Sequence, residues 1–237
     1  MIPIPDSVKL KRNKKSEALL LDKSRKWLER EERAEGIHAS DILNPRRAFF
    51  QKLFPQPLED RQVTIFLVGK VLHGFVLGTM NDKVDLNITD EGSSFSEELG
   101  LWYSPDWDKG DIAEFKTSRA FKEPSSIEDV KTYLEQLLIY MAAKHRLTAE
   151  LWVLYLNLKD AQRRTEPGFR AYTVTISPDD LAVVRQRIIS TRGALEAALE
   201  AKDPSELELC WEWLCSERMC PFWHKCKPPG RYEATSA

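Results

Sequence analysis

The sequence predicts an α/β fold in which a mixed sheet is flanked by helices, and three observations support this. The 237 residues are 42% hydrophobic, which is enough to form one well-cored domain with appendages. Apolar residues recur with helical spacing in some segments and alternate in others, in the order helix, three strands, helix, two strands, helix. All four cysteines lie between Cys210 and Cys226, so we expect a small separate unit at the C-terminal end.

The helices expected in the N-terminal third cover 16–35, 40–54 and 63–80. The first is charged. The second begins where Ser40 or Asp41 can act as an N-cap, with its apolar residues packed inward and Arg46 and Arg47 on its polar side. The third is apolar nearly all round, which predicts a buried helix despite its three glycines.

The remaining segments change period. Strands are expected over 83–89, 98–105, 111–118, 150–158 and 169–176, with a turn at 107–110. An amphipathic helix is expected over 127–146, and a long helix over 178–201 with Ser177 as its cap and Pro178 in its first turn. A short tryptophan-rich helix is expected to lead into the cysteines.

The net charge of -2 argues against a histone-like nucleic-acid binder, but the charge is uneven. Between Lys9 and Lys26, eight basic residues face two acidic ones, a local +6 that suits contact with a phosphate backbone or a solvated arm. The sequence has no apolar run of about 18 residues, and its first residues lack the apolar core of a signal peptide. We therefore expect a soluble, cytoplasmic protein that does not contact a membrane.

The strand expected over 111–118 carries an acid and a base on one side. Because a strand alternates faces, Glu114 and Lys116 project together while Phe115 points into the opposite layer. An ammonium group beside a carboxylate suits phosphodiester hydrolysis, in which a water is deprotonated and charge develops on the phosphoryl oxygens. The alternative is a surface hairpin with an ordinary salt bridge between the two side chains.

A second carboxylate is expected beside Glu114. A five-residue loop after Asp106 would place it opposite Ile112, on the same face, where the two acids could share Mg²⁺ through oxygen ligands. Asp111 would face the other way or lie in the loop. It is the fallback acid if the hairpin register is shifted by one residue.

Three further polar residues lie on expected helices, one of them in an otherwise apolar segment. His73 follows Gly69 by one helical turn, and could complete a metal shell or be a hydrogen-bonded core histidine. Gln136 and Tyr140 are one turn apart and emerge on one helix face. They could contact a phosphate or orient Lys116, or they could form a helix flank half in solvent.

Taken in order along the chain, these residues resemble the motifs of the RecB-type nucleases of the PD-(D/E)XK superfamily. The resemblance covers about 40–158: Gly69 with His73, Asp106 in Ser-Pro-Asp, Glu114-Phe-Lys116, and Gln136 with Tyr140. It implies a restriction-endonuclease-like core and a Mg²⁺- or Mn²⁺-dependent deoxyribonuclease, an exonuclease acting on single-stranded DNA ends.

The same resemblance implies a role for each residue. The metal ligands would be His73, Asp106, Glu114 and the carbonyl of Phe115, and Lys116 would act on the water or the transition state. Gln136 and Tyr140 would position the substrate.

Clustered cysteines in a cytoplasmic protein indicate a metal site rather than disulfides. Four thiolates, supplied by Cys210, Cys215, Cys220 and Cys226, suit a 4Fe-4S cluster or Zn²⁺, and His224 could replace one of them around zinc. Residues 40–46 and the last two cysteines resemble the CRISPR-associated RecB-like exonucleases, which favours iron-sulfur. That branch has a cysteine where this chain has Asn44, and Cys210 supplies a thiolate that could compensate.

These features divide the chain into a basic N-terminal arm and helix (1–36), a nuclease core (37–202) and a cysteine-rich unit with its tail (203–237). An alternative function is a DNA-end-binding adaptor, or a structural subunit of a CRISPR adaptation or repair complex. A protein partner such as an integrase or helicase is then expected. No helicase motif occurs in the sequence, so the chain would be a partner of the motor.

Overall fold

The fold was analysed in a computed structural model that describes residues 14–28, 34–57, 59–80, 93–159 and 164–230. The strand expected over 83–89 lies outside the described residues, as do residues 1–13 of the basic arm. Within the described residues, no helix is both long and apolar enough to cross a bilayer.

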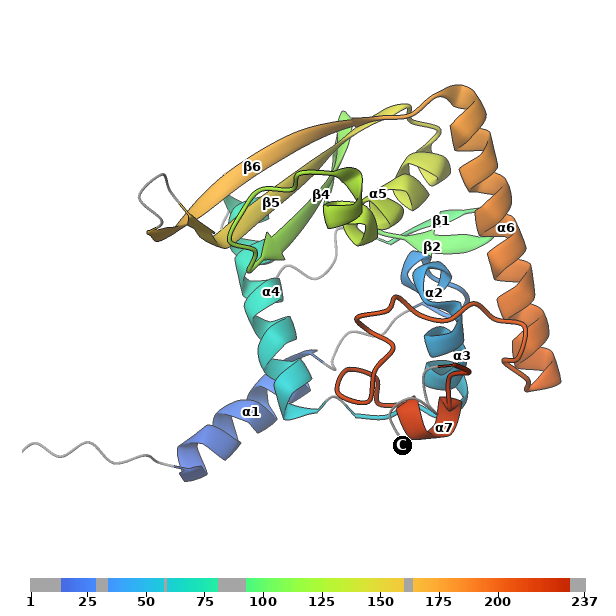
Figure 1. Ribbon diagram of the computed structural model, residues 1–237, viewed down its shortest axis with the longest axis horizontal. Helices are drawn as coiled ribbons and strands as arrows, with labels where there is room; N and C mark the ends of the chain where they lie inside the picture. Colours follow the sequence, from blue (N-terminus) through green and yellow to red (C-terminus); the bar gives the residue numbers. More distant parts are fainter. Residues whose placement is uncertain (1–13, 29–33, 58, 81–92, 160–163, 231–237) are drawn as a thin grey trace, which may run out of the picture.

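A mixed four-stranded sheet forms the centre of the molecule, as expected. Its order is β3-β4-β5-β6, with a parallel pair at β4 and β5 and antiparallel pairs on both sides. A separate two-stranded hairpin, β1 with β2, lies beside helix α6 (Figure 1). The strands are β1 Ser94–Ser96, β2 Leu101–Tyr103, β3 Trp107–Lys109, β4 Asp111–Ser118, β5 Thr148–Lys159 and β6 Thr165–Thr175.

Helix α5 packs its apolar side on one face of this sheet. It spans Lys131–Lys144 and follows a 3-10 turn at Ile127–Val130, so the expected helix over 127–146 is confirmed with a tighter first turn. Leu137 and Met141 are fully buried, because they face the strand that carries Leu151. Burial of this apolar area stabilises the fold by about 25 cal/mol per Å².

Helix α6, Pro178–Ala201, packs against α5 and has the bounds that the sequence predicts. The Ser177 hydroxyl accepts a hydrogen bond from the Asp180 amide at 3.1 Å, which caps the helix. The helix ends at Lys202, which adopts a left-handed conformation with φ of 54°.

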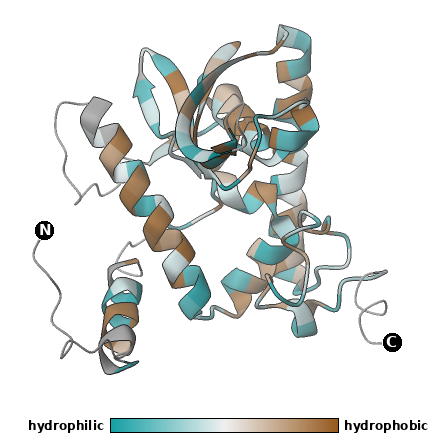
Figure 2. Cartoon of the chain, turned by 60° about the vertical axis from the view of Figure 1, so that its left-hand side comes forward, coloured by the Kyte–Doolittle hydropathy of each residue, from teal (hydrophilic) through white to brown (hydrophobic). Residues whose placement is uncertain are grey.

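Helix α4, Asp60–Met80, is only partly covered by the other described residues. The helix was predicted correctly, but its burial was not: Phe66 is 44% exposed and Phe75 is 54% exposed. Figure 2 shows the hydrophobic residues along this helix. The composition of α4 predicts burial because it is apolar all round, whereas it is the packing partner that decides which side is covered.

Two short helices replace the single one expected over 40–54. Pro45 has no amide hydrogen and begins a new helix, so α2 (Ala39–Leu43) and α3 (Pro45–Leu53) meet at Asn44. The residue before α2 is His38, not Ser40 or Asp41, and the Asp41 carboxylate accepts its amide hydrogen at 3.0 Å. Arg46 is buried, contrary to the expected polar position.

The C-terminal segment of the described chain folds back onto α3. After α6, the chain runs back past α3 and α2 before it ends at α7, Trp223–Cys226 (Figure 1). The tryptophan-rich helix expected before the cysteines is absent from residues 203–222, which form turns. At the other end, α1 (Lys14–Leu28) packs against α4.

Candidate active site and cysteine pocket

The tight β3–β4 hairpin places Asp106 beside Glu114. Gly110, with φ of 98°, makes the turn, and Trp107 pairs with Ala113. The expected register was therefore wrong, since Ile112 pairs with Asp108 instead of Asp106. Extending the observed register by one residue brings Asp106 level with Glu114.

Glu114 and Lys116 project toward α5, as alternation along β4 predicts. The Glu114 side chain is only 1% exposed and is bonded through Oε1 to the Lys116 ammonium. Lys116 Nζ also donates to Gln136 Oε1 at 2.8 Å, and Gln136 Nε2 donates to the Tyr140 hydroxyl at 2.7 Å. One polar chain thus runs from the centre of the sheet onto the helix.

Asp106 connects this chain to α4. Its Oδ2 accepts the Phe115 amide at 2.7 Å, which fixes the carboxylate on the strand. Its Oδ1 lies 3.0 Å from His73 Nε2, although that nitrogen is buried without a hydrogen bond. The His73 ring lies 5.7 Å from that of Phe115, so the imidazole packs against the strand.

Burial and charge shift the ionisation of this group. Burial, reinforced by the negative charge of Asp106, raises the pKa of Glu114 from 4.5 to about 8. Burial acts to lower the pKa of Lys116, but the charges of Glu114 and Asp106 outweigh it and raise that pKa. A cation bound beside Glu114 would favour its ionised form and so act against the rise in its pKa.

The residues present fit a divalent cation in their chemistry. Glu114 Oε2 and His73 Nε2 are buried with no hydrogen-bond partner among the described residues, and leaving such atoms unpaired costs free energy. Carboxylate oxygens and an imidazole nitrogen suit Mg²⁺ or Mn²⁺. The described side chains include no set of three His, Cys, Asp or Glu already gathered tightly enough to hold an ion.

The structure does not test the predicted roles of two further residues, Asp111 and Phe115. Asp111 is exposed at the start of β4 and faces away from Glu114, as the sequence predicts. Its role as the alternative acid stays a prediction. The Phe115 carbonyl stays a prediction as a metal ligand.

Tyr133 is a neighbour of the site that the sequence reasoning missed. Its hydroxyl group, when ionised, adds to the effect of Glu114 and Asp106 in raising the pKa of Lys116. The signal was present, because Tyr133 precedes Gln136 by three residues and Tyr140 by seven on α5, and so shares their side of the helix.

The four cysteines line one small cavity, together with Phe50, Phe222 and Trp223. The rings of Phe50 and Phe222 stack at 5.9 Å. Burial raises the pKa of Cys210 to about 12 and also raises the pKa values of Cys220 and Cys226, so unliganded thiols stay protonated. Trp213 is 55% exposed and does not line this cavity, so it does not cover the four thiols.

Two arginines of α3 border the same cavity. Arg46 Nε donates to Cys226 Sγ at 3.2 Å, and its NH1 group donates to the Pro204 carbonyl at 2.9 Å. Arg47 lowers the pKa of Cys210 through its positive charge and a backbone hydrogen bond. Buried positive charge next to thiols favours thiolates, the form that binds metals.

Asn44 and Trp211 link the cysteine segment to the rest of the molecule. The Asn44 side-chain oxygen accepts the Trp211 amide at 3.3 Å, next to Cys210, and Asn44 does not line the cysteine cavity. The Trp211 indole donates to Glu135 on α5 at 2.6 Å. Glu135 directly precedes Gln136, so the cysteine segment holds the helix that completes the polar chain.

Comparisons with known proteins show a shared fold. No protein-family model matches the chain, and no curated protein matches it. A solved structure described as SSO0001 is 19% identical with a TM-score of 0.56, over 91% of this chain and 97% of that one. An alkaline exonuclease (LHK-Exo) from Laribacter hongkongensis is 16% identical with a TM-score of 0.44, over 70% of this chain and 90% of that one. The shared fold rests on the first of these structures.

Proposed function

We propose that this chain is a metal-dependent deoxyribonuclease of the PD-(D/E)XK superfamily that removes nucleotides from single-stranded DNA ends. The observation that carries the proposal is a buried carboxylate, Glu114, with one oxygen bonded to Lys116 and the other unpartnered. An ordinary surface salt bridge would be exposed, and this pair is not.

His73, Asp106 and Glu114 would hold the cation. When bound, a divalent cation supplies charge neutralisation at the phosphoryl oxygens and makes water more acidic. Each of the three ligands has a fixed position: the Phe115 amide holds Asp106, Lys116 holds Glu114, and the sheet packs against His73.

Lys116 is the group that meets the developing charge. The Lys116 side chain is 22% exposed, so it reaches from the buried carboxylate toward the space above the strand. Gln136 limits where the ammonium can move, and Tyr140 in turn orients the Gln136 amide. Preorganised donors of this kind stabilise a transition state without reorganisation.

Incubation of the purified chain with end-labelled single-stranded and duplex DNA tests the proposal, in Mn²⁺, in Mg²⁺ and in EDTA. We expect loss of label as short products from single strands with either metal and none in EDTA. Binding of DNA ends without cleavage under any metal condition would replace this proposal with an end-binding adaptor that acts beside an integrase or helicase.

We further propose that the cysteine pocket holds a 4Fe-4S cluster. Its four thiols line one cavity, and four thiolates suit a 4Fe-4S cluster or Zn²⁺. The resemblance of residues 40–46 and of the last two cysteines to the CRISPR-associated exonucleases favours the cluster. Arg46 and Arg47 fit an anionic centre. Anaerobically purified protein should be brown with broad visible absorbance, whereas colourless protein with stoichiometric zinc would replace the cluster by Zn²⁺.

A further inference from the structure

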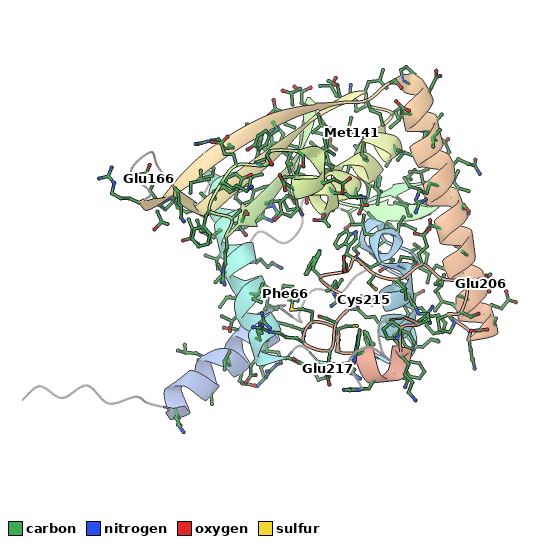
Figure 3. All side chains as sticks on the ribbon, viewed as in Figure 1. Phe66, Met141, Glu166, Glu206, Cys215 and Glu217 are labelled. Atoms are coloured by element: carbon green, nitrogen blue, oxygen red, sulfur yellow. The ribbon has the colours of Figure 1, made fainter. Side chains whose placement is uncertain are left out.

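A cleft of about 160 Å³ lies between the first turns of α4 and the turns of the C-terminal segment. Figure 3 shows Phe66 on α4 and, across from it, the segment that carries Cys215 and Glu217. From α4 the cleft is lined by Ile65 and Phe66, and from the C-terminal segment by Trp213 and Met219. None of these residues belongs to the polar chain around Glu114.

The cleft combines exposed rings with positive charge. Trp213 is 55% exposed and Phe66 is 44% exposed, so both rings are accessible to a planar ligand. Arg47, Arg61 and Arg218 line the same cleft, and the buried Arg47 Nε has no hydrogen-bond partner among the described residues. Aromatic rings between arginines are the pattern that binds single strands, by base stacking and phosphate contacts.

Two carboxylates also line the cleft and offset part of this charge. They belong to Glu59 and Glu217, and Glu217 lies 3.2 Å from the imidazole of His224. Three arginines against two glutamates leave a small positive balance. We therefore expect stacking on the rings, more than phosphate contact, to provide most of the affinity of this cleft.

One side of α4 connects the cleft with the active site. Phe66 and His73 are seven residues apart, so they lie on the same side of the helix, about 10.5 Å apart along its axis. Gly69 lies between them. Apart from the helix's own backbone, no described atom lies within 4 Å of the position that a Cβ of Gly69 would take, so this stretch is open.

We propose that the strand to be cut runs from the active site across Gly69 into this cleft, where its bases stack on Phe66 and Trp213. This inference rests on the proposed nuclease function and adds the path of its substrate. At the 3.4 Å spacing of stacked nucleotides, the helix segment between the cleft and His73 spans roughly three nucleotides. The chemical class of ligand is single-stranded nucleic acid, because a cleft of this size accommodates single bases and not a duplex.

A substitution series at Gly69 tests the path. Alanine, leucine and phenylalanine at this position all favour the helix over glycine, so the melting temperature should be equal to or above that of the original chain. Cleavage of single strands should fall progressively from Gly69→Ala to Gly69→Leu to Gly69→Phe. Cleavage by Gly69→Phe at the original rate would overturn the path.

Binding tests the cleft without cleavage. In a Glu114→Gln background, Trp213→Ala should weaken binding of a fluorescent oligothymidylate of about 12 nucleotides by about 5- to 150-fold, the range measured for one stacked base. Phe169→Ala is the matched control, because Phe169 is 59% exposed but lies on β6, outside the cleft, and it should leave the affinity unchanged.

The possible outcomes separate this inference from the proposed function. Equal binding by the Trp213→Ala and Phe169→Ala proteins, in a chain that cleaves DNA, would overturn the cleft and leave the nuclease. Loss of affinity on Trp213→Ala in a chain that cleaves nothing with any metal would support the cleft and overturn the nuclease.

Discussion

Glu114 lies where water does not reach it, and one ammonium group is the only hydrogen-bond donor that the described residues offer its side chain. Carboxylates in such surroundings are costly to the fold, so a functional reason for the charge is expected. Lys116 is also buried. Burial disfavours its positive charge, and the negative charges of Glu114 and Asp106 favour it. The charge of each residue therefore stabilises the charged form of the other in the buried site.

We predict that Lys116→Ala and Glu114→Gln abolish cleavage and leave folding and DNA binding nearly intact. Removal of one preorganised donor costs about 100- to 1000-fold in rate, and loss of a ligand charge should cost at least as much. Cleavage rates, melting temperatures and DNA affinities of the three proteins check this. Wild-type cleavage in EDTA, or an active Glu114→Gln protein, would contradict the metal mechanism.

The two aspartates of the hairpin are predicted to differ. Asp106→Asn should cost activity by orders of magnitude, because its carboxylate contacts both His73 and the Phe115 amide. Asp111→Asn should cost much less, since Asp111 is exposed on the other face of β4. Single-turnover cleavage by both variants decides the matter, and a larger loss for Asp111→Asn would exclude Asp106 as the second acid.

The raised pKa of Glu114 predicts a pH-dependent stability in the absence of metal. A carboxyl group whose pKa is raised on folding stabilises the fold fully below about pH 4.5, and this contribution is lost as the pH rises toward 8. In EDTA, the free energy of unfolding should therefore fall by a few kcal/mol between about pH 5 and about pH 8. Denaturant titrations of the original chain and of Glu114→Gln measure this, and equal slopes in both would show that Glu114 is not the source.

At the scale of elements, regular patterns were predicted better than their environments. Ser177 and Pro178 define the start of α6 chemically, so its bounds follow from local sequence. The β3–β4 register does not, because a loop of five residues and a tight turn at Gly110 are equally compatible with the residues between the strands. The exposure of Phe66 and Phe75 on α4 depends on residues far along the chain, which the pattern of one helix cannot reveal.

In the candidate site, too, contacts within one element were predicted better than contacts between elements. Spacing placed Glu114 with Lys116 and Gln136 with Tyr140, since each pair lies within one element. The bond from Lys116 to Gln136 joins two elements and was expected only as one of several possibilities. The contact of Trp211 with Glu135 was not expected, because 76 residues separate the two.

That contact predicts an effect of the cysteine segment on catalysis. Trp211→Phe keeps an aromatic ring at this position but removes the indole N–H that donates to Glu135 on α5. We therefore expect a several-fold lower kcat with little change in KM. Trp152→Phe is the matched control, because its indole also donates to a carboxylate, that of Glu150 at 2.5 Å, but on the opposite face of the sheet. Steady-state kinetics of both variants check this, and equal kcat values would show that the contact is structural only.

At the scale of the molecule, α3 is joined to the C-terminal segment. Arg46 holds the Pro204 carbonyl and the Cys226 sulfur, which lie 158 and 180 residues away. Phe50 stacks on Phe222 in the same region. The cysteine pocket is therefore built from α3 and the C-terminal segment, and a metal centre in it would stabilise the contact between them.

The last prediction compares two neighbours in this pocket, Cys210 and Asn44. Cys210 lines the cavity, and Asn44 does not but accepts the amide of the next residue, Trp211. If four C-terminal thiolates hold the centre, Cys210→Ala removes a ligand. The metal-site free energy is also folding free energy, so the protein should lose its colour and iron, melt at a lower temperature and aggregate. Asn44→Ala removes one neutral hydrogen bond, worth about 1 kcal/mol, and should keep full colour.

Visible absorbance, iron content and melting temperature of anaerobically purified variants measure the difference. If the Asn44→Ala protein is colourless and the Cys210→Ala protein is fully coloured, the fourth ligand comes from Asn44, at the start of α3, and not from Cys210. If Asn44→Ala loses its colour only because the protein unfolds, the melting curve will show this. Cys210→Ser then provides the second arm, because it keeps the size of the side chain and removes the soft sulfur donor on which an iron-sulfur centre depends.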